Sequence, residues 1–282
     1  MICMLINCNT RSDTLIIVDL FKDSNAVALA PKLSKRFATV KHVSSRKKAF
    51  ELCEELKPLT VFIDSDIGLG PLILFTRLKF FSKNTSISVY EEGIGTYRED
   101  LFKNPIKKIL YKLIGAATHF GENIFTKHIY VYELNKYKTT FPASKEKALQ
   151  IEKSLVEWIK ENESDLVEIF SPNFDIAHTG ERLEINIYLS NWTLDKETIA
   201  KLSKNNHIHI KPHPHIKDSM KEALSSNPNV HFFPAQLPAE IIIIKASALF
   251  KKVNIYHHNS SALHYAHLTN VTSIDANSLN KD

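Results

Sequence analysis

The segment that decides the fold is residues 184–214, EINIYLSNWTLDKETIAKLSKNNHIHIKPHP. It begins with the apolar run Glu184–Leu189, which predicts a strand. Lys196–Ser203 predicts a helix, and His207–Ile210 predicts a second strand. A strand, a helix and a strand in this order predict a parallel βα arrangement. The segment then ends on Lys211-Pro212-His213-Pro214, where the second strand ends, and that is the position at which open α/β sheets bind their ligands.

Strands and helices alternate in the same way through most of the chain. The other strands that we expect are Ile2–Asn7, Ala26–Ala30, Thr39–Val43, Thr60–Ile63, Ser86–Tyr90, Val230–Phe233, Val253–Tyr256 and Thr272–Ile274. The other helices are Ser12–Phe21, Arg46–Leu56, Leu72–Phe81, Ser144–Lys160 (followed by a polar break at Glu161–Asp165), Asp218–Leu224, Ala239–Lys245 and Ser261–His267. Repeated βα units predict an α/β fold with parallel sheets. The simplest architecture is two Rossmann-like domains, residues 1–150 and 151–282, facing a central cleft that suits a nucleotide.

Composition excludes several classes of protein. The 282 residues are 44% hydrophobic and 24% charged, as in ordinary globular proteins with room for two domains. A net charge of +5 is too small for the dense basic face of a nucleic-acid-binding protein. Cys3, Cys8 and Cys53 form no C-x-x-C pair, so neither a disulfide framework nor a zinc site is expected. No run approaches about 18 apolar residues, and Met1–Asn7 is too short for a signal peptide. We expect a cytoplasmic protein without a nucleic-acid partner, whose oligomeric state the sequence leaves unknown.

Two further predicted strands also end on polar residues. Glu91-Glu92-Gly93 follows the strand that ends at Tyr90, and Asn259-Ser260-Ser261 follows the strand that ends at Tyr256. The two glutamates point to opposite faces of an extended segment, so we expect one to enter the cleft, where it could accept a proton. The glycine lets the backbone approach a ligand closely. The two serines precede a helix, where hydroxyl and N–H groups bind anions. A solvated acidic turn and an ordinary N-cap are the alternatives.

Three more side chains lie at predicted strand or helix ends. His213 stands between Pro212 and Pro214, which fix the local backbone, and a rigid imidazole can contact a phosphate or protonate a leaving group. Glu240, at a helix start, could hold a ribose or simply favour the helix dipole. Trp192 could stack on a sugar or base, or pack in the interior.

Metal and dinucleotide motifs are weak or absent. Asp64-Ser65-Asp66 is a D-x-D sequence, but the glycines and the proline that follow it favour a turn over a metal site. Gly93-Ile94-Gly95 lacks the third glycine of the dinucleotide fingerprint, since Arg98 stands in that position. No Walker A sequence is present. We therefore expect no cofactor and no metal.

A basic stretch in the first half has two interpretations. Its charged residues are Arg98, Lys103, Lys107, Lys108, Lys112 and Lys127, and they interleave with Ile106, Leu110, Leu113 and Ile114. The stretch could be a helix packed on the core with a solvated basic face, which we take as the first reading. It could instead be an amphipathic surface helix that touches anionic lipid or a phosphorylated acceptor.

The order of the motifs resembles a known family. An acidic pair with a glycine, then His-Pro, then a serine pair is similar to the bacterial sialyltransferases of glycosyltransferase family 52, with related motifs in families 38 and 80. The match consists of four short patches, of which Glu240 is the fourth. The resemblance implies the GT-B fold, with the acceptor bound by residues 1–150 and CMP-sialic acid by residues 151–282. It implies an inverting transfer of sialic acid to a terminal galactoside of lipooligosaccharide, O-antigen or capsule, without a metal.

The resemblance also implies roles for individual residues. Glu92 would be the general base on the acceptor hydroxyl, and His213 would contact the CMP phosphate as the acid. The remaining donor-binding residues would be Lys211, Pro214, Glu240, which holds the ribose, Ser260 and Ser261, and the weaker acceptor-binding residues Glu91, Gly93 and Trp192. Glutamate stands in both acidic positions where aspartate is common in the family, so either Glu91 or Glu92 could be the base.

Two other classes of function remain open. Another GT-B enzyme could use CMP-Kdo, CDP-glycerol or a UDP sugar, and UDP-GlcNAc 2-epimerases share that fold. A non-catalytic protein could bind a nucleotide or a glycan at the same residues. The basic stretch makes a lipid-linked acceptor, and peripheral contact with the inner face of the inner membrane, further options.

Overall fold

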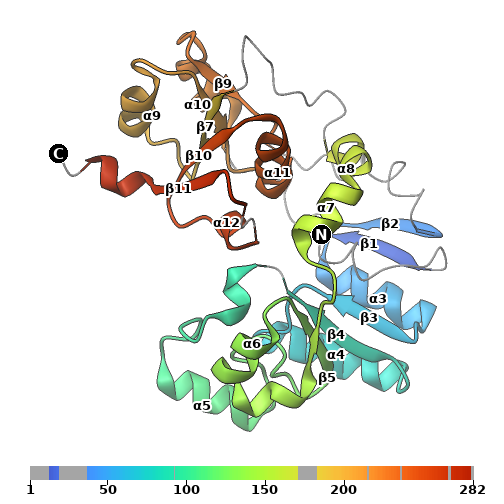
Figure 1. Cartoon of the computed structure of the whole chain (residues 1–282). Helices are drawn as coiled ribbons and strands as arrows, with labels where there is room; N and C mark the ends of the chain where they lie inside the picture. The colour runs from blue at the N-terminus through green and yellow to red at the C-terminus, as the bar shows by residue number, and fades with distance from the viewer. Residues whose placement is uncertain are drawn as a thin grey trace. The chain divides into compact units, whose positions relative to one another are not determined.

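The chain folds into two compact units, Met1–Ser154 and Leu155–Asp282, shown in Figure 1 as a computed structural model. The structure describes residues 13–18, 37–91, 93–170, 183–214, 216–235, 237–265 and 268–280. The first unit ends at Ser154, four residues after the predicted boundary between residues 150 and 151. Every strand pair in the described residues is parallel, so the predicted α/β class with parallel sheets is confirmed. The cleft expected between the units stays a prediction.

The second unit contains a five-stranded parallel sheet with the order β11-β10-β7-β8-β9 (Figure 1). Its strands are β7 (Glu184–Leu189), β8 (Ile208–Lys211), β9 (Val230–Phe232), β10 (Lys252–His257) and β11 (Val271–Asp275). Counted along this unit from β7, the spatial order is third, second, first, fourth, fifth. That is the order in which a Rossmann fold builds its sheet outward from a central first strand.

Helices connect these strands and bury the apolar side chains. They are α7 (Leu155–Glu161), α8 (Glu163–Phe170), α9 (Lys196–Ser203), α10 (Asp218–Ser225), α11 (Ala239–Leu249), α12 (Ala262–Tyr265) and the 3-10 helix η3 (Ala276–Asn280). Asp195 caps α9, because its side chain accepts from the amides of Glu197 and Thr198. The four isoleucines Ile241–Ile244 are all buried, since α11 packs against α7, α8 and β10. A helix that is apolar on all sides is thus an interior helix.

The first unit contains two parallel sheets. A pair is formed by β1 (Thr14–Val18) and β2 (Thr39–Val43), and a four-stranded sheet has the order β3-β4-β5-β6. The strands of the second are β3 (Thr60–Ile63), β4 (Ser86–Tyr90), β5 (Thr126–Val131) and β6 (Ala148–Gln150). The helices are α3 (Arg46–Leu56), α4 (Leu69–Phe81), α5 (Pro105–Leu113), α6 (Leu134–Thr140) and the 3-10 helices η1 (Ile94–Tyr97) and η2 (Pro142–Lys147).

Three predicted elements of the chain are wrong. The helix expected at Ser12–Phe21 contains strand β1, because Thr14–Val18 is rich in β-branched residues and pairs with β2. The helix expected at Ser144–Lys160 is three elements instead: the end of η2, strand β6 and the start of α7. Ala148 pairs there with Ile129 of β5, so a tertiary partner overrides local helix propensity. The expected break at Glu161–Asp165 narrows to Asn162, after which α8 begins.

Some sequence-based expectations lie outside the described residues. They are the strands Ile2–Asn7 and Ala26–Ala30, and the cysteines Cys3 and Cys8. Cys53 is buried with a free thiol, and burial raises its pKa to about 11. Among the described helices, none has the length and hydropathy needed to cross a membrane.

Candidate functional site

Three neighbouring strands of the second unit end in one row. Leu189 of β7 pairs with Lys211 of β8 on one side and with His257 of β10 on the other. The segments that follow these residues therefore leave the sheet at the same level, from strands about 4.8 Å apart. We call this region the carboxyl edge. The chain turns from β7 toward β8 on one side, and β10 lies on the other side of β7. Such a topological switch point is where open α/β sheets bind ligands.

His213 lies in the segment that leaves the carboxyl edge after β8. Its backbone amide donates to the hydroxyl oxygen of Ser190, which follows β7, at 2.8 Å. A turn forms directly after it, because the amide of Ile216 donates to the His213 carbonyl at 2.9 Å. The Trp192 ring lies against the imidazole with 4.5 Å between ring centroids. Trp192 is 65% exposed, so it presents a flat aromatic surface rather than packing in the interior. Pro214 is exposed in the same turn.

Lys211 lies beneath this turn. Its side chain is buried, and Nζ donates to the carbonyl oxygens of Pro212 at 2.5 Å and Ala235 at 3.0 Å. Burial lowers its pKa to about 8, although the carboxylate of Glu240 acts in the opposite direction. The ammonium group thus ties the loop after β8 to the loop after β9. Its charge lies close under the carboxyl edge, but its hydrogen bonds are made to protein carbonyls.

Glu240 lies in the first turn of α11, half-buried, two residues after Pro238. Its carboxylate lies near enough to Lys211 to influence that residue's pKa, which places it beside the loop after β8. The fold thus brings Lys211 and Glu240, two predicted donor-binding residues, close together from the end of β8 and from the helix that follows β9.

The loop after β10 supplies the predicted serines. Asn259 takes a left-handed conformation, with φ of 55°, which turns the chain into α12. The Ser260 hydroxyl oxygen accepts from the amide of Ala262, the first residue of this helix, at 3.4 Å. Ser261 is exposed one residue later. The Ser260 hydroxyl therefore contacts the start of the helix, close to the ordinary N-cap interpretation, and Ser261 is the hydroxyl on the surface.

Sequence reasoning missed three residues at this edge. Ser190 fixes the His213 backbone, and Tyr188 of β7 forms a 2.9 Å hydrogen bond between its hydroxyl and Nε2 of His258. The second ring nitrogen of His258 lies 3.0 Å from the side-chain oxygen of Asn277. The sequence signal that could have identified His258 is a histidine close to the end of a strand. His258 follows the end of β10 just as His213 follows the end of β8.

Of the predicted acidic pair, Glu91 belongs to the interior of the first unit. Its buried carboxylate accepts from the Tyr97 hydroxyl and from the amide of Tyr132 at 2.7 Å. The Tyr97 oxygen in turn accepts from the amide of Glu133 at 2.9 Å, and burial together with Glu91 raises the Tyr97 pKa. The expectation that Glu91 contacts an acceptor is therefore corrected: it joins the end of β4 to the loop after β5. Glu92 lies outside the described residues.

Gly93 has a conformational role. Its φ is 119° and it is buried at the start of η1, a backbone conformation that residues with a side chain rarely adopt. The glycine is required by the turn itself, whatever ligand approaches it.

The D-x-D sequence is a structural turn. The buried carboxylate of Asp66 accepts from the amides of Gly121 at 3.0 Å and Asn123 at 3.2 Å, and from the Thr126 hydroxyl at 2.8 Å. Burial raises the pKa of the Asp66 carboxyl, and this effect is larger than the lowering by the three hydrogen-bond donors. Asp64 is paired with Arg46 at 2.5 Å. Within the described part of the chain, no group of three or more histidine, cysteine or acidic side chains is placed to hold a metal ion.

Comparisons with known proteins give only distant structural similarity. No family model and no curated protein matches the chain. It is similar to UDP-GlcNAc 2-epimerase from Neisseria meningitidis bound to UDP-GlcNAc, at 14% identity over 92% of this chain and 74% of that one, with a TM-score of 0.47. The S. aureus MnaA–UDP structure matches at 8% identity over 93% and 70%, with a TM-score of 0.48. A putative UDP-N-acetylglucosamine 2-epimerase from Listeria monocytogenes matches at 9% over 90% and 76%, with a TM-score of 0.46.

Proposed function

We propose that the protein is an enzyme that acts on a nucleotide sugar and binds the nucleotide at the carboxyl edge of the second unit. One observation carries this proposal. The segments after β7 and β8 bring Trp192 and His213 into contact at the switch point of a Rossmann-ordered sheet. An exposed indole beside a half-buried imidazole offers a stacking surface and a proton donor in one place.

The chemistry of a departing nucleotide fits these residues. When a sugar leaves its nucleotide, negative charge develops on a phosphate oxygen. His213 can donate a proton or a hydrogen bond to that oxygen, and the charge of Lys211 lies beneath the same loop. Ser261 adds an exposed hydroxyl from the loop after β10. General acid help of this kind is worth roughly 10²–10⁴-fold in rate.

The finer proposal concerns the donor. The order of the sequence motifs resembles the sialyltransferases, and supports CMP-sialic acid transferred to a galactoside. In that reaction Glu92 takes the proton of the acceptor hydroxyl, the new glycosidic bond forms with inversion, and CMP leaves with a proton from His213. A UDP sugar is the other donor to test, because a UDP nucleotide is bound in two of the similar solved structures. CMP-sialic acid releases CMP, whereas a UDP sugar releases UDP. The affinities of the protein for CMP and for UDP therefore distinguish the two donors.

The decisive experiment is a titration of the full chain with CMP and with UDP, in chelator, by calorimetry. Turnover is then measured with CMP-sialic acid and with UDP-GlcNAc, each with and without lactose. Lactose-dependent release of CMP supports the sialyltransferase proposal. UDP binding with turnover of UDP-GlcNAc supports the alternative. Binding of either nucleotide without turnover of any donor supports a non-catalytic role.

Two variants test the site itself. His213→Ala should weaken nucleotide binding and abolish turnover. The matched control is His207→Ala, an exposed histidine at the other end of the same strand, β8, which should leave both unchanged. Glu92→Gln should abolish transfer and leave nucleotide affinity nearly intact. Full nucleotide affinity and turnover in His213→Ala would show that the carboxyl edge is not the site.

A further inference from the structure

Helix α5 carries its apolar residues on the side that faces away from the protein. Ile106, Ile109, Leu110 and Leu113 recur at the spacing of one helix face, and they are between 56% and 77% exposed. No residue of α5 is buried. A helix on a globular core turns this stripe inward, so the first interpretation of the basic stretch, a helix packed on the core, is wrong.

The helix is held in place by its other side and its ends. Asn104 caps its start, accepting from the amide of Lys107 at 3.1 Å, and Pro105 occupies the first turn. Tyr111 contacts the Phe102 ring, with 5.2 Å between centroids, and Lys112 forms an ion pair with Glu122 at 3.3 Å. The exposed apolar side is therefore a fixed feature of a folded helix.

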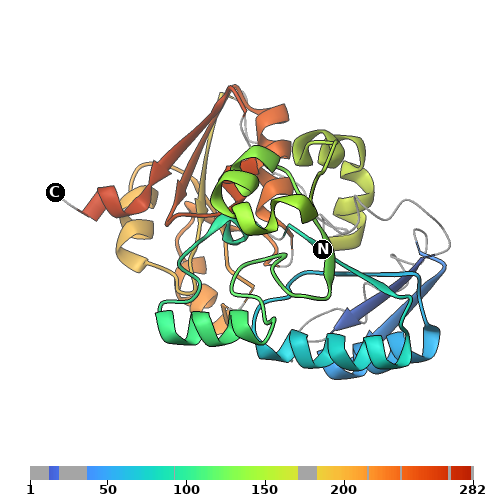
Figure 2. The ribbon, with the colours of Figure 1, turned by 90° about the horizontal axis from the view of Figure 1, so that it is seen from below.

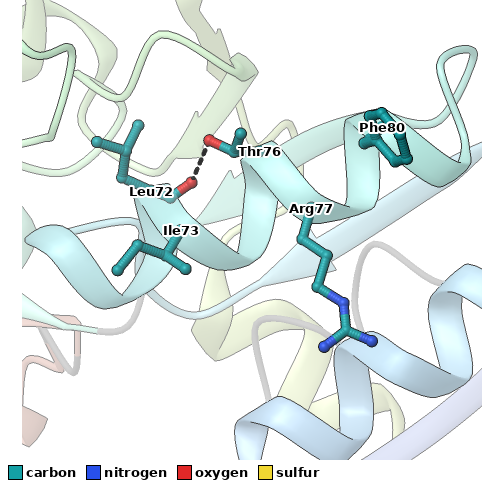
Figure 3. A pocket seen from close by; sticks show the side chains of 5 residues that line it. All are labelled: Leu72, Ile73, Thr76, Arg77 and Phe80. Carbon is teal, nitrogen blue, oxygen red and sulfur yellow. Dashed lines mark hydrogen bonds between the residues drawn. The ribbon is translucent and has the colours of Figure 1, made fainter.

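The apolar surface continues beyond the helix. Ile114 and Ile124 are both more than half exposed, and the amide of Ile124 donates to the carbonyl of Gly115 at 3.1 Å. Helix α4 runs along the same side of the first unit as α5 (Figure 2). It bears a shallow apolar depression, lined by Leu72, Ile73, Thr76, Arg77 and Phe80 (Figure 3). Most of the large apolar side chains exposed in the described residues belong to the first unit.

Positive charge surrounds the apolar side of α5. Lys103, Lys107, Lys108 and Lys112 lie in or next to the helix, and the sequence has no acidic residue between positions 101 and 121. Lysine stems can lie along an apolar surface while their ammonium groups reach outward. An apolar stripe between lysines is the pattern of a helix that lies in the interface of an anionic membrane.

We propose that α5 docks the protein on the surface of an anionic lipid bilayer. The helix would lie in the plane of the interface, because its nine residues span only about 13 Å, against a hydrocarbon core of about 30 Å. Ile106, Ile109, Leu110 and Leu113 enter the boundary between headgroups and acyl chains, and the lysines contact lipid phosphates. A second copy of the chain fits the surface less well, since a two-fold contact would bring the same lysines together.

The test is co-sedimentation of the full chain with vesicles of phosphatidylcholine alone and with vesicles containing a quarter phosphatidylglycerol. We expect binding to the anionic vesicles that weakens as salt is raised. Hydrogen exchange on bound protein should show protection of residues 103–114. Equal partition to both vesicle types, or no protection of this segment, would overturn the proposal.

Two pairs of variants assign the binding to α5. Leu110→Ser with Leu113→Ser should reduce partition at least tenfold, whereas Leu59→Ser with Leu183→Ser, at exposed leucines elsewhere, should leave it unchanged. Lys107→Gln with Lys108→Gln should reduce it by about 25-fold, since each lysine near an anionic surface contributes about fivefold. The matched control is Lys47→Gln with Lys48→Gln on α3.

Self-association is the competing outcome. If the leucine pair in α5 changes the molecular mass in solution and not the partition to vesicles, the surface binds a second copy and the lipid proposal is wrong. If the Leu110→Ser, Leu113→Ser variant unfolds, the proposal can still be refuted. The Lys107→Gln, Lys108→Gln variant and the salt dependence test it independently. None of these residues belongs to the carboxyl edge, so failure here leaves the proposed function intact.

Discussion

The buried Lys211 makes the free energy of unfolding of the second unit rise with pH in the alkaline range. Its pKa is about 8 in the folded protein, against an ordinary value of 10.5. That difference corresponds to about 3 kcal/mol. Below pH 8 the side chain is protonated in both states, and the folded protein bears the full cost of burying the charge. As pH rises from 8 to 10.5, the folded state releases this proton before the unfolded state does. The unfolded state then binds more protons, so the free energy of unfolding rises with pH.

Replacing the lysine by methionine removes this dependence. We expect the free energy of unfolding of the protein, minus that of Lys211→Met, to increase by about 2.5 kcal/mol between pH 7 and pH 10. Urea unfolding at several pH values measures it, and subtraction removes the titration of every other group. Lys204→Met, at an exposed lysine of the same unit, should show no such trend.

The test uses the slope and not the value at pH 7, because methionine also deprives the Pro212 and Ala235 carbonyls of their donor, and that loss shifts the difference equally at every pH below 8. A difference that stays constant from pH 7 to pH 10 would refute the reasoning. It would mean that Nζ reaches water in solution, and that the ammonium does not tie the two loops together.

Two further predictions concern buried carboxylates of the first unit. Tyr97→Phe removes the phenol that donates to Glu91, and should lower the free energy of unfolding by about 1–3 kcal/mol without changing nucleotide affinity, as measured by urea unfolding and calorimetry. Asp66→Asn places an NH₂ group against the amides of Gly121 or Asn123, and should cost about 2 kcal/mol or more, measured by urea unfolding at pH 7. A loss of nucleotide binding in Tyr97→Phe, or a stable Asp66→Asn protein, would contradict these structural roles.

The elements that the sequence predicts well are those whose local pattern agrees with their tertiary environment. Lys196–Ser203 forms α9 with the predicted bounds, because Asp195 caps it and its apolar residues face the core. Glu184–Leu189 forms β7 with the predicted bounds because four of its six residues are buried and the strand pairs with a neighbour on each side. In both cases local propensity and burial favour the same conformation.

The wrong predictions arise where a distant partner decides. Ala148–Gln150 lies in a sequence that favours a helix, and only its pairing with β5 makes it a strand. β5 is absent from the strands expected from the sequence, although Thr126–Val131 contains the strand-favouring residues Thr, Ile, Tyr and Val. A distant partner also explains Glu91. Its buried carboxylate accepts from the Tyr97 hydroxyl and the Tyr132 amide. The local sequence of an acidic pair after a strand is the same whether the carboxylate contacts a ligand or a tyrosine.

For the candidate site, the sequence could predict which strand ends carry chemistry, but not which of their side chains reach the surface. Proline on both sides marks His213 as a fixed imidazole, and the structure adds Trp192 beside it. Lys211, two residues earlier and the last residue of β8, is buried, and its Nζ donates to the carbonyls of Pro212 and Ala235. His213 lies beyond the end of β8, where its amide donates to the Ser190 hydroxyl and its carbonyl accepts from Ile216, and these contacts belong to the folded loop.

The two proposals together restrict the kind of acceptor. A nucleotide sugar is small and reaches the carboxyl edge by diffusion, so membrane attachment changes its local concentration little. A lipid-linked acceptor is confined to the bilayer, and an enzyme held there by α5 meets it at a much higher effective concentration. Loss of the apolar side of α5 should therefore raise the apparent KM for a vesicle-borne acceptor, and leave the KM for the donor and for lactose unchanged. An equal effect on all three substrates would mean that α5 supports the fold of the first unit rather than its location.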